Sequence, residues 1–480
     1  MNIKNIIYIL GYIILFTGAF FVLPFSTGLL YHEAGAALLY LGLGILYMAI
    51  GGMILHFRPK TRSLFSRDGA VAVALGWIIM SLLGAVPFTA LGEIPSYIDA
   101  VFETVSGFTT TGSSILTNVE ALSHASLFWR SFTHWVGGMG VLVLIMAVFP
   151  MMGGYDMNLM KMESPGPSVT KFVPHIKDSA KILYSLYFLI TMAQIICLLI
   201  ARMPLFDTLC ITFGTVGTGG FGIRADSCAS YTTAQQYIIS IFMILSGINY
   251  TAYFLIASRK WKAALKLEEV RWYLIIIAVS TALICLNIRQ MFPDFEQTFR
   301  ASLFAVSTII TTTGYATVDF NLWPYFSKFI LCLLMVIGAC AGSTGGGLKV
   351  SRVLLLTRGL KNELSLIVHP HERRIVRMDG EKVESSTMRN TQVYLTAYSL
   401  ILALSILIIS LDNFDFETNV TAVLATFNNI GPGLAGVGPT SNFSAYSPLS
   451  KIVMIFDMLA GRLEIFPLLI LMYRKTWKKH

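Results

Sequence analysis

Charged residues are scarce in this chain: only 13% of its 480 residues are Asp, Glu, Lys or Arg, whereas 55% are hydrophobic. A soluble domain usually carries about 25% charged residues, so this composition excludes an ordinary soluble enzyme. Apolar runs recur along the sequence, and many approach the roughly 20 residues that a helix needs to cross a bilayer. The sequence therefore predicts an all-α polytopic membrane protein.

Signatures of catalysis, nucleotide binding and metal binding are also missing. The sequence has no HExxH, no GxxxxGK[ST] and no GxGxxG after a strand, and its six cysteines lack metal-type or disulfide-framework spacing. GSTGGGLK, which ends at Lys349, resembles a phosphate loop, but it lies in an apolar segment and no hydroxyl residue follows the lysine. His369 and His371 are interpreted as ordinary polar residues, and His134 as a packing residue. We therefore expect neither an enzyme nor an organic cofactor.

The net charge of +9 does not indicate nucleic acid binding, because the basic residues gather in short loops between apolar runs. Basic clusters follow residues 55, 151, 257, 356 and 472, and the intervening loops are acidic. Since basic loops remain in the cytoplasm, both termini are expected there, in the inner membrane of a prokaryote. About ten full spans, with four segments that enter and leave on the outer side, satisfy this alternation.

Four threonine- and glycine-rich runs organise the sequence: FETVSGFTTTGS at 102–113, FGTVGTGG at 213–220, TIITTTGY at 308–315 and NNIGPGL at 428–434. We align them at Gly112, Gly219, Gly314 and Gly433, because another glycine follows each by 28 residues, at Gly140, Gly247, Gly342 and Gly461. This predicts four pseudo-symmetric units of helix, re-entrant pore loop and helix after an N-terminal helix hairpin. The hairpin covers 1–68, and the units cover 69–165, 166–268, 269–388 and 389–480.

Non-helical backbone in mid-membrane is tolerated only where it lines an aqueous path or is buried in protein. Four short helices ending there direct their negative ends at the centre and favour a cation, and the backbone that follows offers carbonyl oxygens in place of water. Close helix packing would explain one such run, but four in one frame favour a filter. Its predicted residues are Thr110, Thr111, Gly112, Gly217, Thr218, Gly219, Thr312, Thr313, Gly314, Gly431, Pro432 and Gly433. The predicted carbonyl ligands belong to Thr110, Thr111, Val216, Gly217, Thr218, Thr312, Thr313, Ile430 and Gly431, within the wider segments 109–113, 216–220, 311–315 and 430–434.

With HWVGGMG at 134–140, GSTGGGLK at 342–349 and MLAGRLEIFP at 458–467, these runs resemble the Trk/Ktr/HKT superfamily of potassium transporters, and specifically its TrkH branch. Glycine at all four aligned positions implies K+ as the transported ion, with Rb+ as a surrogate, since a serine at the first position accompanies sodium transport in that superfamily. The resemblance also implies a homodimer and a cytosolic TrkA-type ring of RCK nucleotide-binding domains. The basic loops after residues 151, 257 and 356 are its candidate docking surfaces.

The third inward helix carries five glycines between Gly338 and Gly347, too many for a continuous helix at about 1 kcal/mol each. We predict a loop inside the membrane. In the family that this chain resembles the segment obstructs the pore, so we assign it as the gate, with a flexible packing hinge as the alternative. Arg462 is expected to project into the cavity below the filter, or else to pair with Glu464 or Asp457. The predicted gate residues are Gly338, Gly342, Ser343, Thr344, Gly345, Gly346, Gly347 and Arg462.

Channel-like potassium uptake is thus the favoured function. The alternative is a secondary transporter that couples a cation or proton to another solute, which would call for broken spans with paired carboxylates near the midplane. Few acidic residues lie in the spans, chiefly Asp457 and Glu464, so strict coupling is not supported. In the loop after the third inward helix, IVRMDGEKVE predicts a small hairpin around Asp379 and Gly380.

Overall fold

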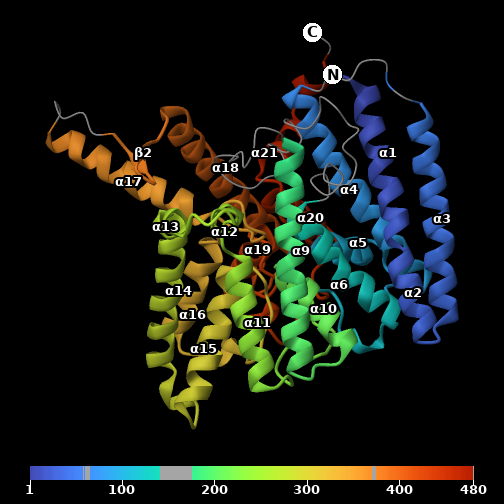
Figure 1. Cartoon of the computed structure of the whole chain (residues 1–480), viewed down its shortest axis with the longest axis horizontal. Coiled ribbons are helices and arrows are strands. Elements are labelled where there is room, and N and C mark those ends of the chain that lie inside the picture. Colours follow the sequence, from blue (N-terminus) through green and yellow to red (C-terminus); the bar gives the residue numbers. More distant parts are fainter. Residues whose placement is uncertain (58, 60–64, 141–175, 370–374, 479–480) are drawn as a thin grey trace.

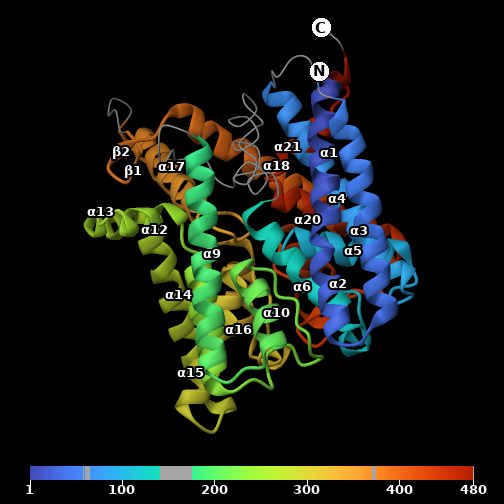
Figure 2. The same ribbon diagram turned by 45° about the vertical axis from the view of Figure 1, so that its right-hand side comes forward.

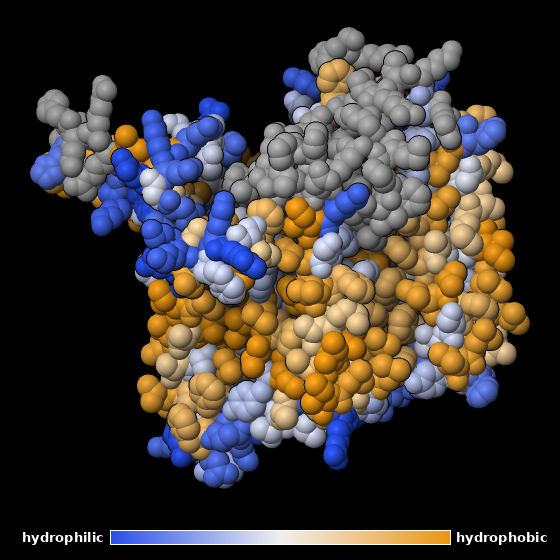
Figure 3. Space-filling view, viewed as in Figure 1, coloured by the Kyte–Doolittle hydropathy of each residue, from blue (hydrophilic) through white to orange (hydrophobic). Residues whose placement is uncertain are grey.

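The computed structural model describes residues 1–57, 59, 65–140, 176–369 and 375–478, and these are mostly helical. Long helices stand side by side, and both termini lie at the same end of the molecule (Figure 1). A broad apolar band crosses the middle of the visible face, and hydrophilic side chains gather above and below this band (Figure 3). This distribution suits a chain that spans a membrane, as the composition predicts.

The N-terminal hairpin consists of α1 (Ile3–Phe20), which continues after a break at Phe21 as α2 (Val22–Leu30), and α3 (Ala34–His56). The two arms approach closely through glycine: a side chain on Gly18 would meet the backbone of Gly44, and one on Gly51 would meet Leu15. Small residues of this kind allow helices to pack tightly within a bilayer. The predicted hairpin is therefore present, and it packs against α4 and α6 (Figure 2).

Four units follow, each with a long helix, a short helix of 12 or 16 residues and a third helical segment, which is interrupted in units two, three and four. Unit one has α4 (Ser66–Ala90), α5 (Tyr97–Phe108) and α6 (His124–Met139). Unit two has α9 (Ile176–Ile200), α10 (Leu205–Val216), α11 (Thr233–Ser246), α12 (Tyr250–Ala257) and α13 (Trp261–Lys266). Unit three has α14 (Glu268–Asn287), α15 (Phe295–Ile310), α16 (Tyr325–Val336) and α17 (Val350–Val368). Unit four has α18 (Ser385–Ile409), α19 (Phe416–Phe427), α20 (Pro448–Arg462) and α21 (Phe466–Met472).

Shorter elements connect these helices. The predicted hairpin near the end of unit three is confirmed as β1 (Arg377–Met378) paired antiparallel with β2 (Glu381–Lys382). Its two turn residues, Asp379 and Gly380, have positive φ angles of 53° and 83°, as a tight two-residue hairpin turn requires. Single 3-10 turns occur at Val119–Ala121, Arg289–Met291, Phe320–Leu322, Ser410–Asp412, Ala435–Val437 and Arg474–Trp477.

The sequence predicts continuous inward helices in every unit except unit three, and the structure differs from this expectation. Among the described residues, six helical stretches are long and apolar enough to cross a membrane unbroken, and α11 with α12 forms a seventh that is bent by 91°. The predicted break in unit three is confirmed between Val336 and Val350. In unit four the helix also breaks, between Arg462 and Phe466, and in unit one α6 ends at Met139, beyond which residues 141–151 of the predicted span lie outside the described residues. Gly140, Gly247 and Gly461 lie at or beside these helix ends, and Gly342 lies within the break of unit three; glycine has a lower helix propensity than any residue except proline.

Candidate functional site

The chain adopts the same backbone course after each of the four short helices α5, α10, α15 and α19. The second residue past each helix has a φ angle of 55° or 56°, and the fourth is a glycine with a φ angle between 80° and 102°. The third donates its N–H to the carbonyl five residues earlier, at 2.7–2.9 Å. The four equivalent stretches, here called the ring segments, are 109–113, 217–221, 311–315 and 428–432.

This equivalence corrects the sequence alignment in two units. Gly220 and Gly431, not Gly219 and Gly433, match Gly112 and Gly314 in both φ angle and hydrogen bonding. The equally spaced glycines that set the alignment therefore lie 27 residues after Gly220 and 30 after Gly431. Consequently, Val216 is the last residue of α10, and Gly217 caps that helix. Pro432 and Gly433 come after the backbone turn that the four units share.

The four glycines close a ring around a central axis. A side chain on Gly112 would strike the carbonyl oxygen of Gly219; in the same way Gly220 faces Thr313, Gly314 faces Ile430, and Gly431 faces Thr111. Each unit thus contacts the next, and unit four returns to unit one. Glycine is needed at these positions both for the positive φ angle and because a neighbouring carbonyl occupies the space of a Cβ. Three of the approaches leave no room for a Cβ, and the fourth, at Gly431, leaves 2.9 Å.

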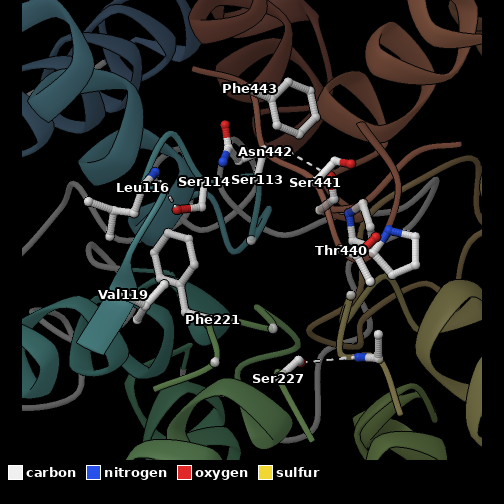
Figure 4. Close-up of a pocket in the computed structure, with 18 of the residues that line it drawn as sticks. Ser113, Ser114, Leu116, Val119, Phe221, Ser227, Thr440, Ser441, Asn442 and Phe443 are labelled. Carbon is white, nitrogen blue, oxygen red and sulfur yellow. Dashed lines mark hydrogen bonds between the residues drawn. The ribbon is translucent and has the colours of Figure 1, made fainter. Parts of the chain in front are cut away.

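All four ring glycines line one cavity of about 140 Å³. Figure 4 shows its walls, with Ser113, Phe221, Ser441 and Phe443 around the opening. Most residues of the ring segments themselves are buried, with exposed fractions of 0–1% for the threonines from Thr109 to Thr111. We call this cavity the vestibule.

Threonine and asparagine side chains support the ring segments laterally. In units one and three the hydroxyl pairs Thr109–Thr111 and Thr311–Thr313 are each 2.8 Å apart, which reflects the shared TTTG sequence. In unit four Asn429 Nδ2 donates to Thr111 Oγ1 at 2.9 Å and also to the Met458 carbonyl at 2.9 Å. β-Branched residues rarely adopt positive φ angles, so the three threonines in that conformation carry backbone strain of the kind found at functional sites.

His134, which the sequence assigns only to packing, contacts one ring segment and the helix that precedes another. Its Nδ1 lies 2.7 Å from the Gly107 carbonyl oxygen, and its Nε2 accepts a hydrogen bond from the Phe221 N–H at 3.2 Å. This pattern requires a neutral imidazole with the proton on Nδ1. The side chain therefore links α5 of unit one to the ring segment of unit two.

Sequence reasoning missed a buried ion pair behind the ring. Arg130 Nε donates to Glu103 Oε1 at 2.6 Å, and both side chains are at most 3% exposed. Arg130 Nη1 also donates to the Gly222 carbonyl, while Glu103 accepts the Ile115 N–H at 3.0 Å. Charges inside apolar helices are costly and mark function by default, so their position within predicted spans was a usable signal.

The loop at residues 337–349, here called the unit-three loop, packs against the ring at the end opposite the vestibule. Gly346 N–H donates to Thr312 Oγ1 at 2.6 Å, and Thr344 Oγ1 donates to the Ser246 carbonyl at 3.2 Å. A side chain on Gly345 would lie 3.0 Å from the Thr311 carbonyl oxygen. The loop therefore contacts units two and three directly beneath the ring.

Two charged residues outside the predicted gate fasten this loop. Lys349, which is 1% exposed, donates through Nζ to the carbonyls of Gly345 and Gly346. Glu269 Oε1 accepts the N–H groups of Ala341 at 2.7 Å and Ser351 at 3.0 Å, so it joins the loop to the first turn of α17. Lys349 is part of GSTGGGLK, where it could have been noticed as a charge inside an apolar run.

Arg462 reaches the unit-three loop from unit four. Its Nη1 donates to the Thr344 carbonyl at 2.7 Å, and its Nη2 donates to the carbonyls of Gly137 and Gly138, both at 2.5 Å. The alternative partners considered from sequence are engaged elsewhere: Glu464 bonds Arg352, and Asp457 accepts from Ser405 Oγ at 2.7 Å. Arg462 therefore connects three units at the level of the loop.

Comparisons with known proteins agree with this architecture. A family model described as TrkH, cation transport protein, matches residues 42–479. The chain is 34% identical over 490 residues to the Trk system potassium uptake protein TrkH of Salmonella typhimurium strain LT2, covering all of both chains. It is 31% identical over 484 residues to TrkG of Escherichia coli K12, covering 99% of each. The crystal structure of the potassium transporter TrkH from Vibrio parahaemolyticus superposes with a TM-score of 0.89 at 31% identity over the whole of both chains.

Proposed function

The chain belongs to the TrkH family of cation transport proteins, and on this premise we propose that it mediates potassium uptake across the cytoplasmic membrane as a channel-like translocator. One observation carries the proposal: the closed ring in which each glycine faces a carbonyl oxygen of the next unit. Such a ring brings backbone carbonyls from four directions to one axis. Carbonyl oxygens in that arrangement replace the water shell of a monovalent cation.

The proposed ligands follow the corrected alignment. They form three levels along the axis: Thr110, Thr218, Thr312 and Asn429 at the inner end; Thr111, Gly219, Thr313 and Ile430 next; and Gly112, Gly220, Gly314 and Gly431 toward the vestibule. The helices α5, α10, α15 and α19 end beside the inner level and add the negative ends of their dipoles. Both contributions favour a cation over an anion at the centre of the protein.

We assign the unit-three loop as the gate. Its contacts with Thr312 and Ser246, and the bond from Arg462 to Thr344, support this role, because they hold backbone across the inner end of the ring. A hinge that only packs helices together would not need a buried lysine bonded to two loop carbonyls. Opening then requires these hydrogen bonds to break together.

The first experiment is growth of a potassium-uptake-deficient bacterium on low K+, followed by Rb+ uptake into proteoliposomes with the purified protein. Potassium transport predicts rescue of growth and Rb+ uptake that K+ inhibits more strongly than Na+. Gly112→Ser places a side chain against the Gly219 carbonyl and should weaken this discrimination about tenfold, the factor that corresponds to roughly 1.4 kcal/mol. Intact discrimination in Gly112→Ser would remove Gly112 from the filter, and absence of rescue by the wild-type protein would overturn potassium uptake itself.

We further propose a homodimer that binds a cytosolic TrkA-type nucleotide-binding ring, with both termini in the cytoplasm. Relatives that are named as parts of a Trk system support a multi-component assembly. The proposed docking surface consists of Arg259 and Lys260, which precede α13, and Arg358 in α17; Figure 1 shows both helices above α14. The third candidate loop, after residue 151, lies outside the described residues. Reversing the charge of Arg259 and Lys260 should abolish co-purification with such a ring while leaving the protein in the membrane.

Proton-coupled transport is kept as a second candidate because of Asp457. This carboxyl group on α20 is fully buried, and within the described residues its Oδ2 has no hydrogen-bond partner. A lone buried carboxyl group in a membrane helix is a feature of proton pathways. Rb+ uptake measured with and without an imposed proton gradient separates the candidates, since a channel-like protein follows the electrical driving force alone. A gradient effect that disappears in Asp457→Asn would favour coupling.

A further inference from the structure

The residue that follows each ring glycine differs among the four units. In units two and three it is aromatic and buried: the Phe221 ring lies 3.5 Å from Arg130 Cζ, and the Tyr315 hydroxyl donates to the Ile211 carbonyl at 3.2 Å. Both side chains fasten their ring segment to the surrounding protein. In unit one the residue is Ser113, and in unit four it is Pro432, so neither segment has an aromatic anchor at this position.

Ser113 instead bonds directly to the neighbouring ring segment. Its Oγ donates to the Gly431 carbonyl at 2.9 Å, and its side chain is 1% exposed. The contact joins unit one to unit four, and it lies at the vestibule end of the ring. Asn429 joins the same two units at the inner end, through its bond to Thr111 Oγ1.

The approach of the glycine to the neighbouring carbonyl is widest at the junction between units four and one. The Gly431 backbone has the largest φ angle of the four glycines, at 102°, and its approach to the Thr111 carbonyl is the only one of the four that leaves 2.9 Å for a Cβ. Pro432 lacks an N–H group and therefore cannot bond this part of the segment to its surroundings. A hydroxyl from across the junction thus bonds the carbonyl that precedes this residue without an N–H group.

We propose that Ser113 is a positioning residue for ion selection, and that its hydroxyl fixes the Gly431 carbonyl at the outer level of the filter. This inference rests on the proposed function of the ring. A small cation such as Na+ binds well only if the carbonyls move inward around it, whereas K+ fits a wider ring. The hydroxyl restrains the Gly431 carbonyl oxygen and so opposes its movement toward the ion. It also engages a lone pair of that oxygen, which weakens the oxygen's electrostatic attraction for a cation. Both effects favour the larger ion.

The test is Rb+ uptake into proteoliposomes, in which the concentrations of Na+ and K+ that halve uptake are compared for each variant. In Ser113→Ala the ratio of these concentrations should fall about fivefold, the factor that one ordinary hydrogen bond controls. Ser113→Thr keeps the hydroxyl and should retain the wild-type ratio. Ser26→Ala is the matched control, because it removes an exposed hydroxyl from α2, none of whose residues lines the vestibule.

A purely structural role for Ser113 would lower the amount of protein and the maximal rate for all ions equally, without changing the ratio. An unchanged ratio in Ser113→Ala at equal abundance therefore overturns the inference while leaving potassium uptake intact. If Ser113→Ala does not accumulate, Ser113→Cys decides the question, since a thiol is a weaker donor of similar size and should shift the ratio in the same direction. A wild-type protein that takes up no Rb+ would instead refute the proposed function.

Discussion

Replacing Arg462 with alanine is expected to raise Rb+ uptake by the isolated protein. The substitution removes the hydrogen bond to the Thr344 carbonyl, one of the contacts that hold the unit-three loop beneath the ring, and frees the carbonyls of Gly137 and Gly138. A hydrogen bond from a charged donor contributes about 2 kcal/mol. If that amount favours the closed loop, its loss shifts the ratio of open to closed protein roughly 30-fold. Loss of the positive charge also removes a repulsion for cations that leave the ring.

The assay is uptake of radioactive Rb+ into proteoliposomes that contain equal amounts of protein and no cytosolic partner. Arg462→Lys separates the two contributions, since it keeps the positive charge but loses the planar fork that bonds Thr344 and the unit-one carbonyls together. A high rate in both variants assigns the effect to the hydrogen bonds, and a high rate in Arg462→Ala alone assigns it to the charge. Unchanged uptake in Arg462→Ala at equal abundance would refute the placement of Arg462 at the gate.

Four further substitutions test other parts of the site. Gly431→Ala should weaken the preference for K+ over Na+ about tenfold because its φ angle is positive, whereas Gly433→Ala should lower protein abundance without changing ion preference; the reverse result would restore the original alignment. Lys349→Met removes the donor to two loop carbonyls and should raise Rb+ uptake about tenfold in the absence of a partner, and a lower rate would contradict its role in closure. Glu103→Gln leaves Arg130 partly unpaired and should destabilise the protein by about 3 kcal/mol; an unaltered thermal unfolding temperature in detergent would contradict this.

The sequence predicted the architecture well where its physical signals are unambiguous. Apolar length and the alternation of basic and acidic loops predicted the helices, and the five glycines of the unit-three loop predicted its break. The breaks in units two and four were missed, because Gly247 and Gly461 stand alone in apolar runs, and a single glycine is compatible with a continuous helix. There the interruption depends on tertiary contacts, such as the bond from the Tyr250 N–H to the Gly342 carbonyl.

Alignment of the ring failed where glycines are neighbours. In units one and three TTTG contains a single glycine, and Gly112 and Gly314 occupy equivalent backbone positions, as the alignment predicts. In units two and four the choice lay between Gly219 and Gly220, and between glycines on either side of Pro432. Composition cannot decide this, because the relevant quantity is the distance from the end of the preceding helix, which is four residues in every unit.

The side-chain contacts of the site were the least accessible to sequence analysis. Ser113 and Gly431 are separated by 318 residues, and nothing in their local patterns indicates a hydrogen bond between them. His134 resembles any buried histidine until the Phe221 N–H is seen beside it. Charge in an apolar run remains the one local signal that would have revealed Glu103 and Lys349.

Closure of the ring within a single chain also has a consequence for biosynthesis. Three of its four junctions join units that are consecutive in the chain, but the junction between Gly431 and Thr111 joins the last unit to the first. Nearly the whole protein must therefore be synthesised before unit one can contact unit four, and until then Ser113 lacks its hydrogen-bond acceptor at Gly431. Chains that terminate before α19 cannot assemble the ring from their own residues.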